Sequence, residues 1–565
     1  MWFLNRKKNY VEVSFEEILL DSSNLPAFNQ GRMEGRIELP ITRRNIYYVG
    51  TFFVIVALLF LVKLFTLQVV AGDEYLKISE NNSIDKNVII AERGVIYDRN
   101  GEMLAWNAQD KKHKFSFPMR AYSDRDGLGQ LVGYVSYPQK DAKGFYYRTE
   151  YEGISGVESS FNDLLQGQNG NQVLEENALG EVIGEHIVNP PQAGEAVTLS
   201  LDAELSEVMF DIIATSTAQA NFRSGAGAIM DIHTGEIIAL ASFPSYDPEV
   251  MADGQDSDLI ASYNNDDRYP FLNKVLGGVY TPGSVMKPFL AYAALKEGII
   301  SPDKVIVSTG EILVPNIYHP SNPTRFRDWR AHGKMTMREA IAFSSNVYFY
   351  YISGGYRDQP GLGITKMDEY YDLFGFGQPT GINLDNEQIG TVPSPAWKQE
   401  NFNDDWRLGD TYLTSIGQFG WQVTPLQILR AYAAIANGGT LVTPQILYGA
   451  EGDTKDLNLD QDKLRVVKEG MRMTVNYPGG TARPLERKDV AIAAKSGTAE
   501  IGAGNAYVNS WVAGYFPYEE PKYSYVLMMD KAPRSNALGA TRIMGDVVEW
   551  MSVNKREYLG LPPLE

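Results

Sequence analysis

One long stretch of the chain is apolar enough to lie in the hydrocarbon core of a membrane. Residues 45–62 carry no charge, and residues 52–62 (FFVIVALLFLV) are wholly apolar. Continued to residue 70, the run has about 25 residues, enough for a helix to cross a hydrocarbon core of roughly 30 Å. The pattern predicts a single transmembrane helix over residues 45–70.

The flanks of this run predict its orientation. Arg43 and Arg44 precede it, and Lys63 lies near enough to its end to reach the interface with its ammonium group. Because positive residues favour the cytoplasmic side, we expect residues 1–44 to form a cytoplasmic arm and the chain after about residue 71 to lie outside. A cleaved signal peptide is disfavoured, because its apolar part would have roughly 7–15 residues and would lie closer to the N-terminus.

Residues 71–195 are rich in turn signals and short extended runs, as at residues 86–90 and 94–97. Asn100-Gly101 is a strong hairpin signal. Pro190-Pro191 marks the end of the region. We expect a separate domain over residues 71–195.

In residues 196–555, strand patterns lie near both ends and helical patterns lie between them. This order is typical of an α+β domain whose sheet is completed by N-terminal and C-terminal strands. A tail, residues 556–565, follows. The expected strands are residues 196–201, 226–232, 236–242, 490–494, 510–515 and 523–529, and the clearest helices are residues 204–222 and 284–296.

Composition narrows the class of protein. With 565 residues, 44% of them hydrophobic and 21% charged, the chain is globular and should hold two or three domains. Its net charge of -19 argues against a general affinity for nucleic acid or anionic lipid. The absence of cysteine excludes disulfides, thiolate catalysis and cysteine-ligated metals.

The first candidate for chemistry is Ser284-Val-Met-Lys287. On a helix this spacing puts both side chains on one face. A lysine whose pKa is lowered by burial can then take the proton of the serine and make it a nucleophile. The pattern alone is weak, since such a pair arises by chance about once per two or three hundred residues of average composition.

Three other segments match the same pattern, beginning at Ser83, Ser301 and Ser552. Only Ser284 follows a Thr-Pro-Gly turn and opens an apolar helix, whose N-terminal dipole favours negative charge on the serine oxygen. We therefore interpret the other three serines as surface polar residues.

Two further motifs follow in order. Ser344-Ser-Asn346 lies at a helix–loop junction, where its hydroxyl and amide groups can relay a proton and hold a carbonyl. Taken alone, a helix-capping serine and a buried asparagine would be the simpler interpretation, and Ser22-Ser-Asn24 has the same pattern.

The last motif is Lys495-Ser-Gly-Thr498, directly after the apolar residues 490–494. A lysine there offers a cation to a substrate carboxylate, Gly497 lets a peptide backbone approach, and the next N–H can face an oxyanion. A simple turn at a strand end is the alternative. Three weak matches in the right order are stronger together, and the same trio occurs in penicillin-binding proteins and β-lactamases.

On these motifs the chain resembles the class B penicillin-binding proteins, from about residue 62 to residue 550. Three more segments resemble the family: Arg93-Gly-Val-Ile-Tyr-Asp-Arg-Asn-Gly101, Gly153-Ile-Ser-Gly-Val-Glu158, and the run from Ser415-Ile-Gly-Gln418 to Ala436-Asn-Gly-Gly439. The resemblance implies an α+β fold with a single transmembrane helix, an elongated non-catalytic pedestal domain of the dimerisation type (71–195), and a transpeptidase domain (196–555) whose central antiparallel sheet is flanked by helices.

Some features resemble the elongation type, penicillin-binding protein 2, more than the division type. These are Asp328-Trp329 with His332-Gly333, Tyr348-Phe-Tyr350, and Trp406 with Gly409-Asp-Thr411.

The chain also departs from the family pattern. Phe419 stands where many relatives have glycine, which would reshape a loop near the site. Some relatives bind zinc through Asp, His and Cys. Because cysteine is absent here, we predict no metal and no cofactor, and expect Asp328 and His332 to cap and hydrogen-bond a loop.

The resemblance implies a mechanism. Lys287 takes the proton of Ser284, which attacks the carbonyl between the two terminal D-alanines of a peptidoglycan stem peptide. Ser344 and Asn346 pass the proton to the leaving D-alanine. Lys495, with Ser496 and Thr498, holds the terminal carboxylate, and an amine of a neighbouring strand resolves the acyl-enzyme. β-Lactams would acylate the same serine.

Other outcomes stay open. If water replaced the amine, the protein would be a D,D-carboxypeptidase or a β-lactamase. It could instead be a membrane scaffold that activates a SEDS-family glycosyltransferase of the RodA type, the partner implied for elongation-type relatives. A β-lactam sensor would need more than 44 cytoplasmic residues, and no glycosyltransferase domain fits before residue 196. The implied location is the bacterial inner membrane, with the catalytic domain extracytoplasmic.

Overall fold

The computed structural model describes residues 43–72, 84–109, 117–142, 146–176, 182–316 and 321–563. The expected cytoplasmic arm, apart from Arg43 and Arg44, lies outside these residues. Contacts divide the chain into two compact units, residues 1–85 with 175–183, and residues 86–174 with 184–565.

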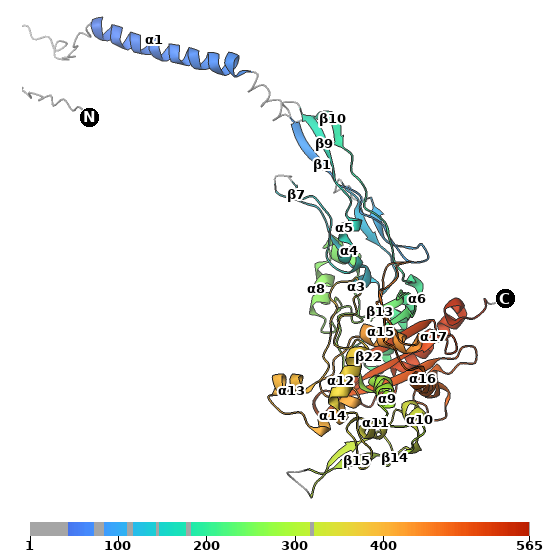
Figure 1. Ribbon diagram of the computed structural model, residues 1–565. Helices are drawn as coiled ribbons and strands as arrows, with labels where there is room; N and C mark the ends of the chain where they lie inside the picture. The colour runs from blue at the N-terminus through green and yellow to red at the C-terminus, as the bar shows by residue number, and fades with distance from the viewer. Residues whose placement is uncertain are drawn as a thin grey trace, which may run out of the picture. The chain divides into compact units, whose positions relative to one another are not determined.

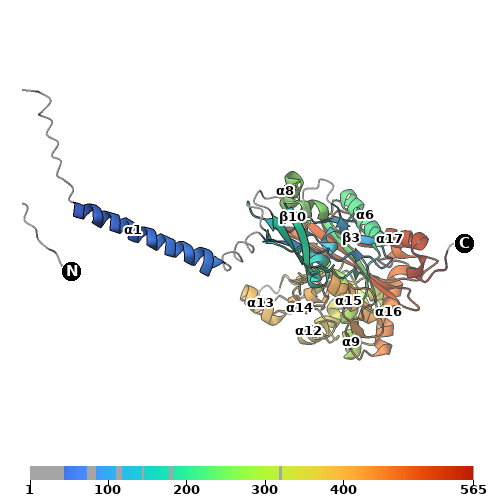
Figure 2. The same ribbon diagram turned by 90° about the horizontal axis from the view of Figure 1, so that it is seen from above.

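The first unit holds the apolar helix. Helix α1 (Arg43–Phe65) continues into a π-helical turn, η4 (Thr66–Val70), giving 28 residues in all. Figures 1 and 2 draw this helix in blue. Its apolar side chains are exposed, and within the described residues no other helix is both long and apolar enough to cross a membrane. This matches the single helix predicted from the sequence and is consistent with a single-pass anchor.

The pedestal contains short strands, as the turn-rich sequence predicts. The predicted hairpin at Asn100-Gly101 is confirmed: it joins β2 (Ile96–Tyr97) to β3 (Met103–Ala108), and Gly101 has a φ of +84°. One sheet has the order β11-β2-β3-β4 and another the order β1-β9-β10. The other bounds are β1 (Ile84–Ile89), β4 (Met119–Tyr122), α3 (Gly129–Val132), β5 (Val135–Ser136), β6 (Gln139–Lys140), β7 (Tyr146–Arg148), β8 (Glu152–Gly153), α4 (Gly156–Ser160), α5 (Asn162–Leu165), β9 (Gly170–Glu176), β10 (Val182–Asn189) and β11 (Val197–Thr198).

Two family-like segments of the pedestal meet through a buried ion cluster. Glu158 accepts from Nε of Arg93 at 2.6 Å and from Nε of Arg120 at 2.7 Å, and all three side chains are fully buried. One carboxylate between two guanidinium groups offsets the cost of burying these charges, so the cluster ties the two segments to strand β4.

The catalytic domain is built on a five-stranded antiparallel sheet with the order β13-β12-β22-β21-β20. Its N-terminal pair, β12 (Ser224–Asp231) and β13 (Ile237–Phe243), lies beside the C-terminal strands β20 (Ala493–Ile501), β21 (Tyr507–Phe516) and β22 (Tyr523–Pro533). The predicted α+β class, with a sheet completed from both ends of the domain, is confirmed.

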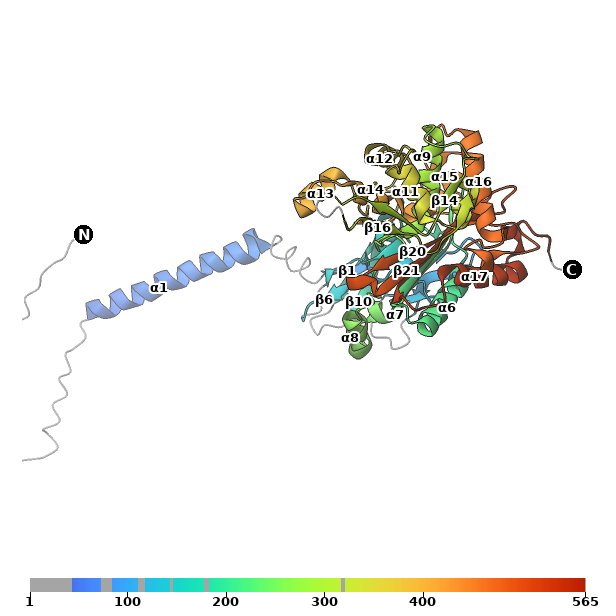
Figure 3. The same cartoon turned by 90° about the horizontal axis from the view of Figure 1, so that it is seen from below.

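Helices cover both faces of this sheet (Figure 3). On one face α6 (Ala203–Ala220) and α17 (Ala540–Asn554) pack in one apolar cluster, and Gly225 and Gly227 leave room for side chains of α6. On the other face α9 (Lys287–Lys296), α15 (Pro425–Ala436) and α16 (Gln461–Asn476) join the larger cluster. The nucleophile motif is therefore placed between the sheet and its second helical layer.

The remaining elements are short. The helices are α7 (Pro248–Asp253), α8 (Ser257–Asn265), α10 (Met337–Ala342), α11 (Asn346–Ser353), α12 (Ile364–Leu373), α13 (Pro395–Phe402) and α14 (Leu408–Ser415). The strands are β14 (Ile306–Ser308), β15 (Glu311–Val314), β16 (Thr324–Arg327), β17 (Gly333–Met335), β18 (Thr440–Val442) and β19 (Thr454–Asp456).

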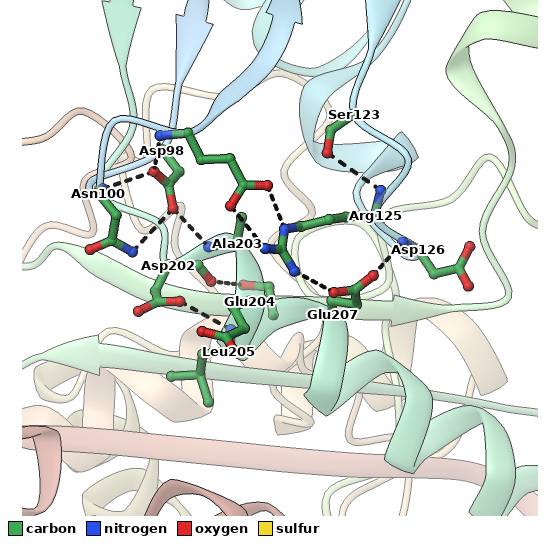
Figure 4. Close-up of polar contacts among 12 residues, drawn as sticks. Asp98, Asn100, Ser123, Arg125, Asp126, Asp202, Ala203, Glu204, Leu205 and Glu207 are labelled. Atoms are coloured by element: carbon green, nitrogen blue, oxygen red, sulfur yellow. Dashed lines mark hydrogen bonds and ion pairs between the residues drawn. The ribbon is translucent and has the colours of Figure 1, made fainter. Parts of the chain in front are cut away.

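The pedestal joins the catalytic domain at the first turns of α6 (Figure 4). Arg125 donates to Glu102 and to Glu207 of α6, each at 2.5 Å. Asp98, beside the hairpin turn, accepts from the backbone N–H of Ala203 at 3.2 Å. The pedestal residues that make these contacts belong to the same compact unit as the catalytic domain. The boundary near residue 195 stays a prediction.

The buried ion cluster yields a stability prediction. Replacing Glu158 with glutamine keeps the shape but leaves two buried guanidinium groups without a countercharge, so we expect a loss of about 3–5 kcal/mol. Thermal unfolding of the detergent-solubilised chain measures it. The control is Glu152→Gln, whose pair with Arg148 is exposed and should contribute at most about 1 kcal/mol. Equal effects of the two substitutions would contradict the prediction.

Candidate active site

Ser284 lies in a tight turn packed against the edge of the sheet. Residues Gly283–Met286 form the 3-10 turn η5, which leads into α9. Gly283 has a φ of +61°, and a Cβ there would lie 2.9 Å from the carbonyl oxygen of Thr498. Only glycine suits such a position without strain. Ser284 is half-buried, and in the described part of the chain its hydroxyl has no hydrogen-bond partner.

Neighbouring elements hold this turn from outside. The indole N–H of Trp511 in β21 donates to the carbonyl of Thr281 at 3.0 Å. The hydroxyl of Tyr432 in α15 donates to the carbonyl of Val285 at 2.7 Å. The nucleophile turn is thus fixed to both the sheet and a buried helix.

Lys287 is fully buried, one turn beyond Ser284. Its Nζ donates to the carbonyl of Ser344 at 2.8 Å and to Oδ1 of Asn346 at 2.7 Å. Burial lowers the pKa of Lys287 to about 7, although the charge of Asp328 acts in the opposite direction. The structure thus links the first motif to the second through this amine.

Lys495 reaches the same serine from the sheet. It too is fully buried, and its Nζ donates to Oγ of Ser344 at 2.7 Å and to the carbonyl of Ser496 at 2.9 Å. Burial and the neighbouring Lys287 both lower the pKa of Lys495 well below its ordinary value. Ser344 has a φ of +56°, a strained conformation for a residue other than glycine and one typical of functional sites.

Asp328 holds the second motif in place. Its carboxylate caps α11 by accepting from the backbone N–H groups of Asn346 at 2.9 Å and Val347 at 3.0 Å, and from Oγ of Ser345 at 2.6 Å. Burial raises the pKa of Asp328, but contacts with His332, Lys287 and the cap donors outweigh it and hold that pKa well below its usual range. The predicted capping role is confirmed.

His332 stands behind Asp328. Its Nδ1 accepts from Nε of Arg330 at 3.2 Å, so the proton of the neutral ring belongs on Nε2. That nitrogen lies 3.5 Å from Oδ1 of Asp328, and both side chains are fully buried. Among the residues that the structure describes, no three His, Cys, Asp or Glu side chains gather in a metal-binding group.

The third motif lies inside a strand rather than after one. The sequence pattern ended the strand at residue 494, but β20 pairs with β21 from Ala493 to Ile501. A Cβ on Gly497 would lie 2.8 Å from the carbonyl oxygen of Pro282, so this glycine lets β20 approach the protein's own nucleophile turn. Oγ of Ser496 donates to Oγ1 of Thr481 at 2.6 Å, and Thr498 is exposed.

Sequence reasoning missed Thr481 and the reach of Asp328 to the second motif. Thr481 follows Gly479-Gly480, and no local pattern there suggests chemistry. Of the other serine–lysine matches, Ser301 is exposed as predicted and Ser83 lies outside the described residues. The surface assignment of Ser552 is wrong, because it is buried in α17 and accepts from Arg487 at 2.8 Å.

Phe419 adopts a backbone conformation that favours glycine. Its φ is +61°, between Gly417 at +72° and Gly420 at +81°. The preceding Gly417 accepts, through its carbonyl, the N–H of Gly283 at 3.0 Å. This loop is therefore in direct contact with the nucleophile turn.

A serine on a tight turn, a buried lysine of lowered pKa, a serine–asparagine pair and a second lysine on a sheet edge define a serine acyltransferase. The family model of the penicillin-binding protein transpeptidase domain matches residues 225–549, and that of the penicillin-binding protein dimerisation domain matches residues 116–199. The chain belongs to the penicillin-binding protein transpeptidase family, whose members are serine transpeptidases.

Individual relatives and solved structures agree with this family assignment. Peptidoglycan D,D-transpeptidase MrdA of Escherichia coli is 28% identical, over 84% of this chain and 89% of the relative. The structure of penicillin-binding protein 2 of Helicobacter pylori in complex with MreC is similar with a TM-score of 0.69 and 27% identity, over 84% of this chain and 99% of that one. A chain from a peptidoglycan synthase complex has a TM-score of 0.70 at 25% identity, over 92% and 99%.

The Asp328 cap yields a prediction. Asp328→Ala leaves buried N–H groups without an acceptor, which should destabilise the protein by about 3 kcal/mol. The displaced Asn346 should slow acylation by penicillin about a hundredfold. Thermal unfolding and a stopped-flow acylation assay measure the two effects. The matched control is Asp303→Ala, whose side chain is 83% exposed and should leave both unchanged. Wild-type acylation by the Asp328 variant would contradict the proposed link to the second motif.

Proposed function

We propose that this protein is a peptidoglycan D,D-transpeptidase of the elongation type, which cross-links stem peptides through an acyl-enzyme on Ser284. The single observation that carries the proposal is the meeting of Lys287 and Lys495 at Ser344, next to the Ser284 turn. The similarity to MrdA and to penicillin-binding protein 2 over most of the chain supports the elongation type.

The contacts of Lys287 suit a general base. A neutral amine has two N–H donors, and the Ser344 carbonyl and the Asn346 amide oxygen accept two hydrogen bonds from it. The lone pair is then left for the proton of Ser284. A pKa of about 7 means that a large share of Lys287 is neutral at physiological pH.

In the acylation step Ser284 Oγ bonds to the carbonyl carbon of the penultimate D-alanine, and the bond to the terminal D-alanine breaks. The proton of the Ser284 hydroxyl passes through Lys287 and Ser344 to the amine of the leaving D-alanine. The N–H groups of Ser284 and Thr498 stabilise the oxyanion, with a contribution on the order of 3 kcal/mol per donor. An acceptor amine then attacks the ester, and Ser284 recovers its proton.

The terminal carboxylate is assigned to the outward hydroxyls of β20. Ser496, paired with Thr481, and the exposed Thr498 follow the buried Lys495 along the strand. Two buried ammonium groups sharing one serine repel each other, so the lysine pair favours a single charge. A substrate carboxylate would favour placing that charge on Lys495, with Gly497 keeping the strand close to Ser284.

The orientation of the anchor and the partners belong to the same proposal. Arg43 and Arg44 before the apolar helix support a cytoplasmic N-terminus and an extracytoplasmic catalytic domain at the bacterial inner membrane. The similar chain from a synthase complex that coordinates polymerization and crosslinking supports a polymerase partner of the SEDS (RodA) type. The similar penicillin-binding protein 2 that binds MreC supports a second partner. A penicillin-binding protein of the same fold is complexed with aztreonam, so we expect β-lactams to be inhibitors.

The first test is labelling of the detergent-solubilised chain with a fluorescent penicillin, beside a Ser284→Ala variant. We expect one adduct on the wild type and none on the variant, with intact mass counting the adducts. A control variant, Ser301→Ala, should label like the wild type because Ser301 is exposed and lies beyond α9, outside the three motifs. A folded wild type without an adduct would favour the scaffold alternative.

The second test is the pH dependence of acylation. The base must be deprotonated, so the rate should fall as pH falls through about 7, the pKa of Lys287. Below that pH we expect about a tenfold loss per unit, and above about pH 8 a plateau. Stopped-flow acylation between pH 5 and 9 measures the profile. A rate independent of pH over this range would rule out Lys287 as a titrating base.

A further inference from the structure

Strand β20 is the edge of the catalytic sheet. It pairs with β21 on one side, and no strand pairs with its other side in the part of the chain that the structure describes. Free N–H and C=O groups on such an edge can pair with an extended peptide as an added strand. Which of these groups are free therefore decides how much of a substrate peptide the strand can bind.

One position on the free edge is already occupied by a side chain. The side-chain amide of Gln418 lies against Glu500. In the amide orientation that gives each atom a partner, its nitrogen donates to the Glu500 carbonyl at 3.2 Å and its oxygen accepts from the Glu500 N–H at 3.0 Å. This two-bond pattern is the one that a residue of a neighbouring antiparallel strand would make. Gln418 thus takes the place of a peptide residue at the end of β20.

The pairing of Glu500 also shows which residues face the free side. Backbone groups of alternate residues point the same way along a strand, so Thr498 and Ser496 present theirs to the same side as Glu500. The carbonyl of Ser496 already accepts from Nζ of Lys495 at 2.9 Å. Thr498, beside the nucleophile turn at Gly283, therefore lies between two positions that the protein itself occupies.

The loop of Gln418 is held by an aromatic cluster. The ring of Phe419 packs edge-on against the rings of Trp397 and Trp406, with centroid distances of 5.9 Å and 5.6 Å. The ammonium group of Lys398 lies 5.8 Å from the centre of the same ring, and Lys398 is itself fixed by an ion pair with Asp410 at 2.7 Å. These contacts compensate the cost of a φ of +61° at a residue with a side chain.

We propose that Gln418 is a specificity-determining residue that closes the free edge of β20 at Glu500, and that Phe419 is the positioning residue that holds it there. A donor peptide then pairs with the strand through one residue only, the one that becomes the acyl group, opposite Thr498. In antiparallel register, the residue two positions earlier would face Glu500, and Gln418 excludes its backbone. The donor chain must leave the sheet edge at that point.

This inference rests on the proposed function, and it has a consequence for substrate class. Backbone recognition is confined to the terminal part of the donor. The site should accept donors whose earlier residues differ in backbone chemistry, provided that they end in the same acyl group and leaving group.

The test uses two ester donors that are identical except at the residue two positions before the acyl residue. One donor has an ordinary amide N–H there, and the other is N-methylated, so that it cannot donate to Glu500. The measurement is the ratio of their acylation rates on the full-length chain in detergent. For the wild type we expect a ratio within about twofold, because Gln418 occupies Glu500. A wild-type ratio of about fivefold or more would overturn the proposal, since a donor would then pair at Glu500.

Three variants sharpen the test. Gln418→Ala opens the edge, so its ratio should rise to about five- to tenfold; a ratio equal to that of the wild type would overturn the role of Gln418. Phe419→Gly suits the backbone but removes the ring, and its ratio should rise toward that of Gln418→Ala. An unchanged ratio for Phe419→Gly would overturn the role of Phe419.

The matched control is Gln399→Ala, on the neighbouring helix α13. Gln399 is exposed, so this variant should keep the wild-type ratio. A raised ratio for Gln399→Ala would overturn the assignment to Gln418.

Penicillin labelling of the same samples separates the two proposals. If penicillin acylates Ser284 but the donor ratios contradict the expectation, the closed edge is wrong and the proposed function stands. If neither penicillin nor either donor acylates the folded wild type, the proposed function fails and this inference fails with it.

Discussion

Two lysine side chains are buried side by side around one serine hydroxyl, and the catalytic half of the molecule is arranged to make that burial tolerable. Removing two ammonium groups from water is costly unless each finds acceptors. Lys287 finds the Ser344 carbonyl and the Asn346 amide, and Lys495 finds Ser344 Oγ and the Ser496 carbonyl. These acceptors come from the turn before α11, from α11 itself and from β20. These bonds therefore fix the positions of α11 and β20 relative to the nucleophile turn, while burial lowers the pKa of both lysines.

The cap beneath α11 belongs to this arrangement. Asp328 supplies the negative charge nearest to Lys287 and also fixes the backbone of Asn346. Its charge raises the pKa of Lys287 while burial lowers it, so the value near 7 is a balance of the two. The Asp328 carboxylate accepts hydrogen bonds from several donors and lies beside His332, so it is held in a fixed position near Lys287.

Much of this could be read from the sequence, and the exceptions have a common cause. The apolar helix, the class of fold and the three motifs follow from periodicity and short spacing. The pairing of Arg93 with Glu158, the hydroxyl contact of Thr481 with Ser496, and the role of Gly497 against Pro282 depend on residues far apart in the chain. The length of β20 was mistaken because polar residues such as Lys495 end an apolar pattern without ending a strand. Pairing with β21, rather than local composition, sets where that strand stops.

The edge of β20 has a further consequence, for solubility. A long, open strand edge invites pairing with the edges of other molecules and so promotes aggregation. A transpeptidase that binds an extended peptide must nevertheless keep such an edge accessible. With Lys495 bonded to the carbonyl of Ser496 and Gln418 bonded to Glu500, the opening is narrowed to about one residue, at Thr498. The same side chains would then protect the protein from misassembly with its own copies.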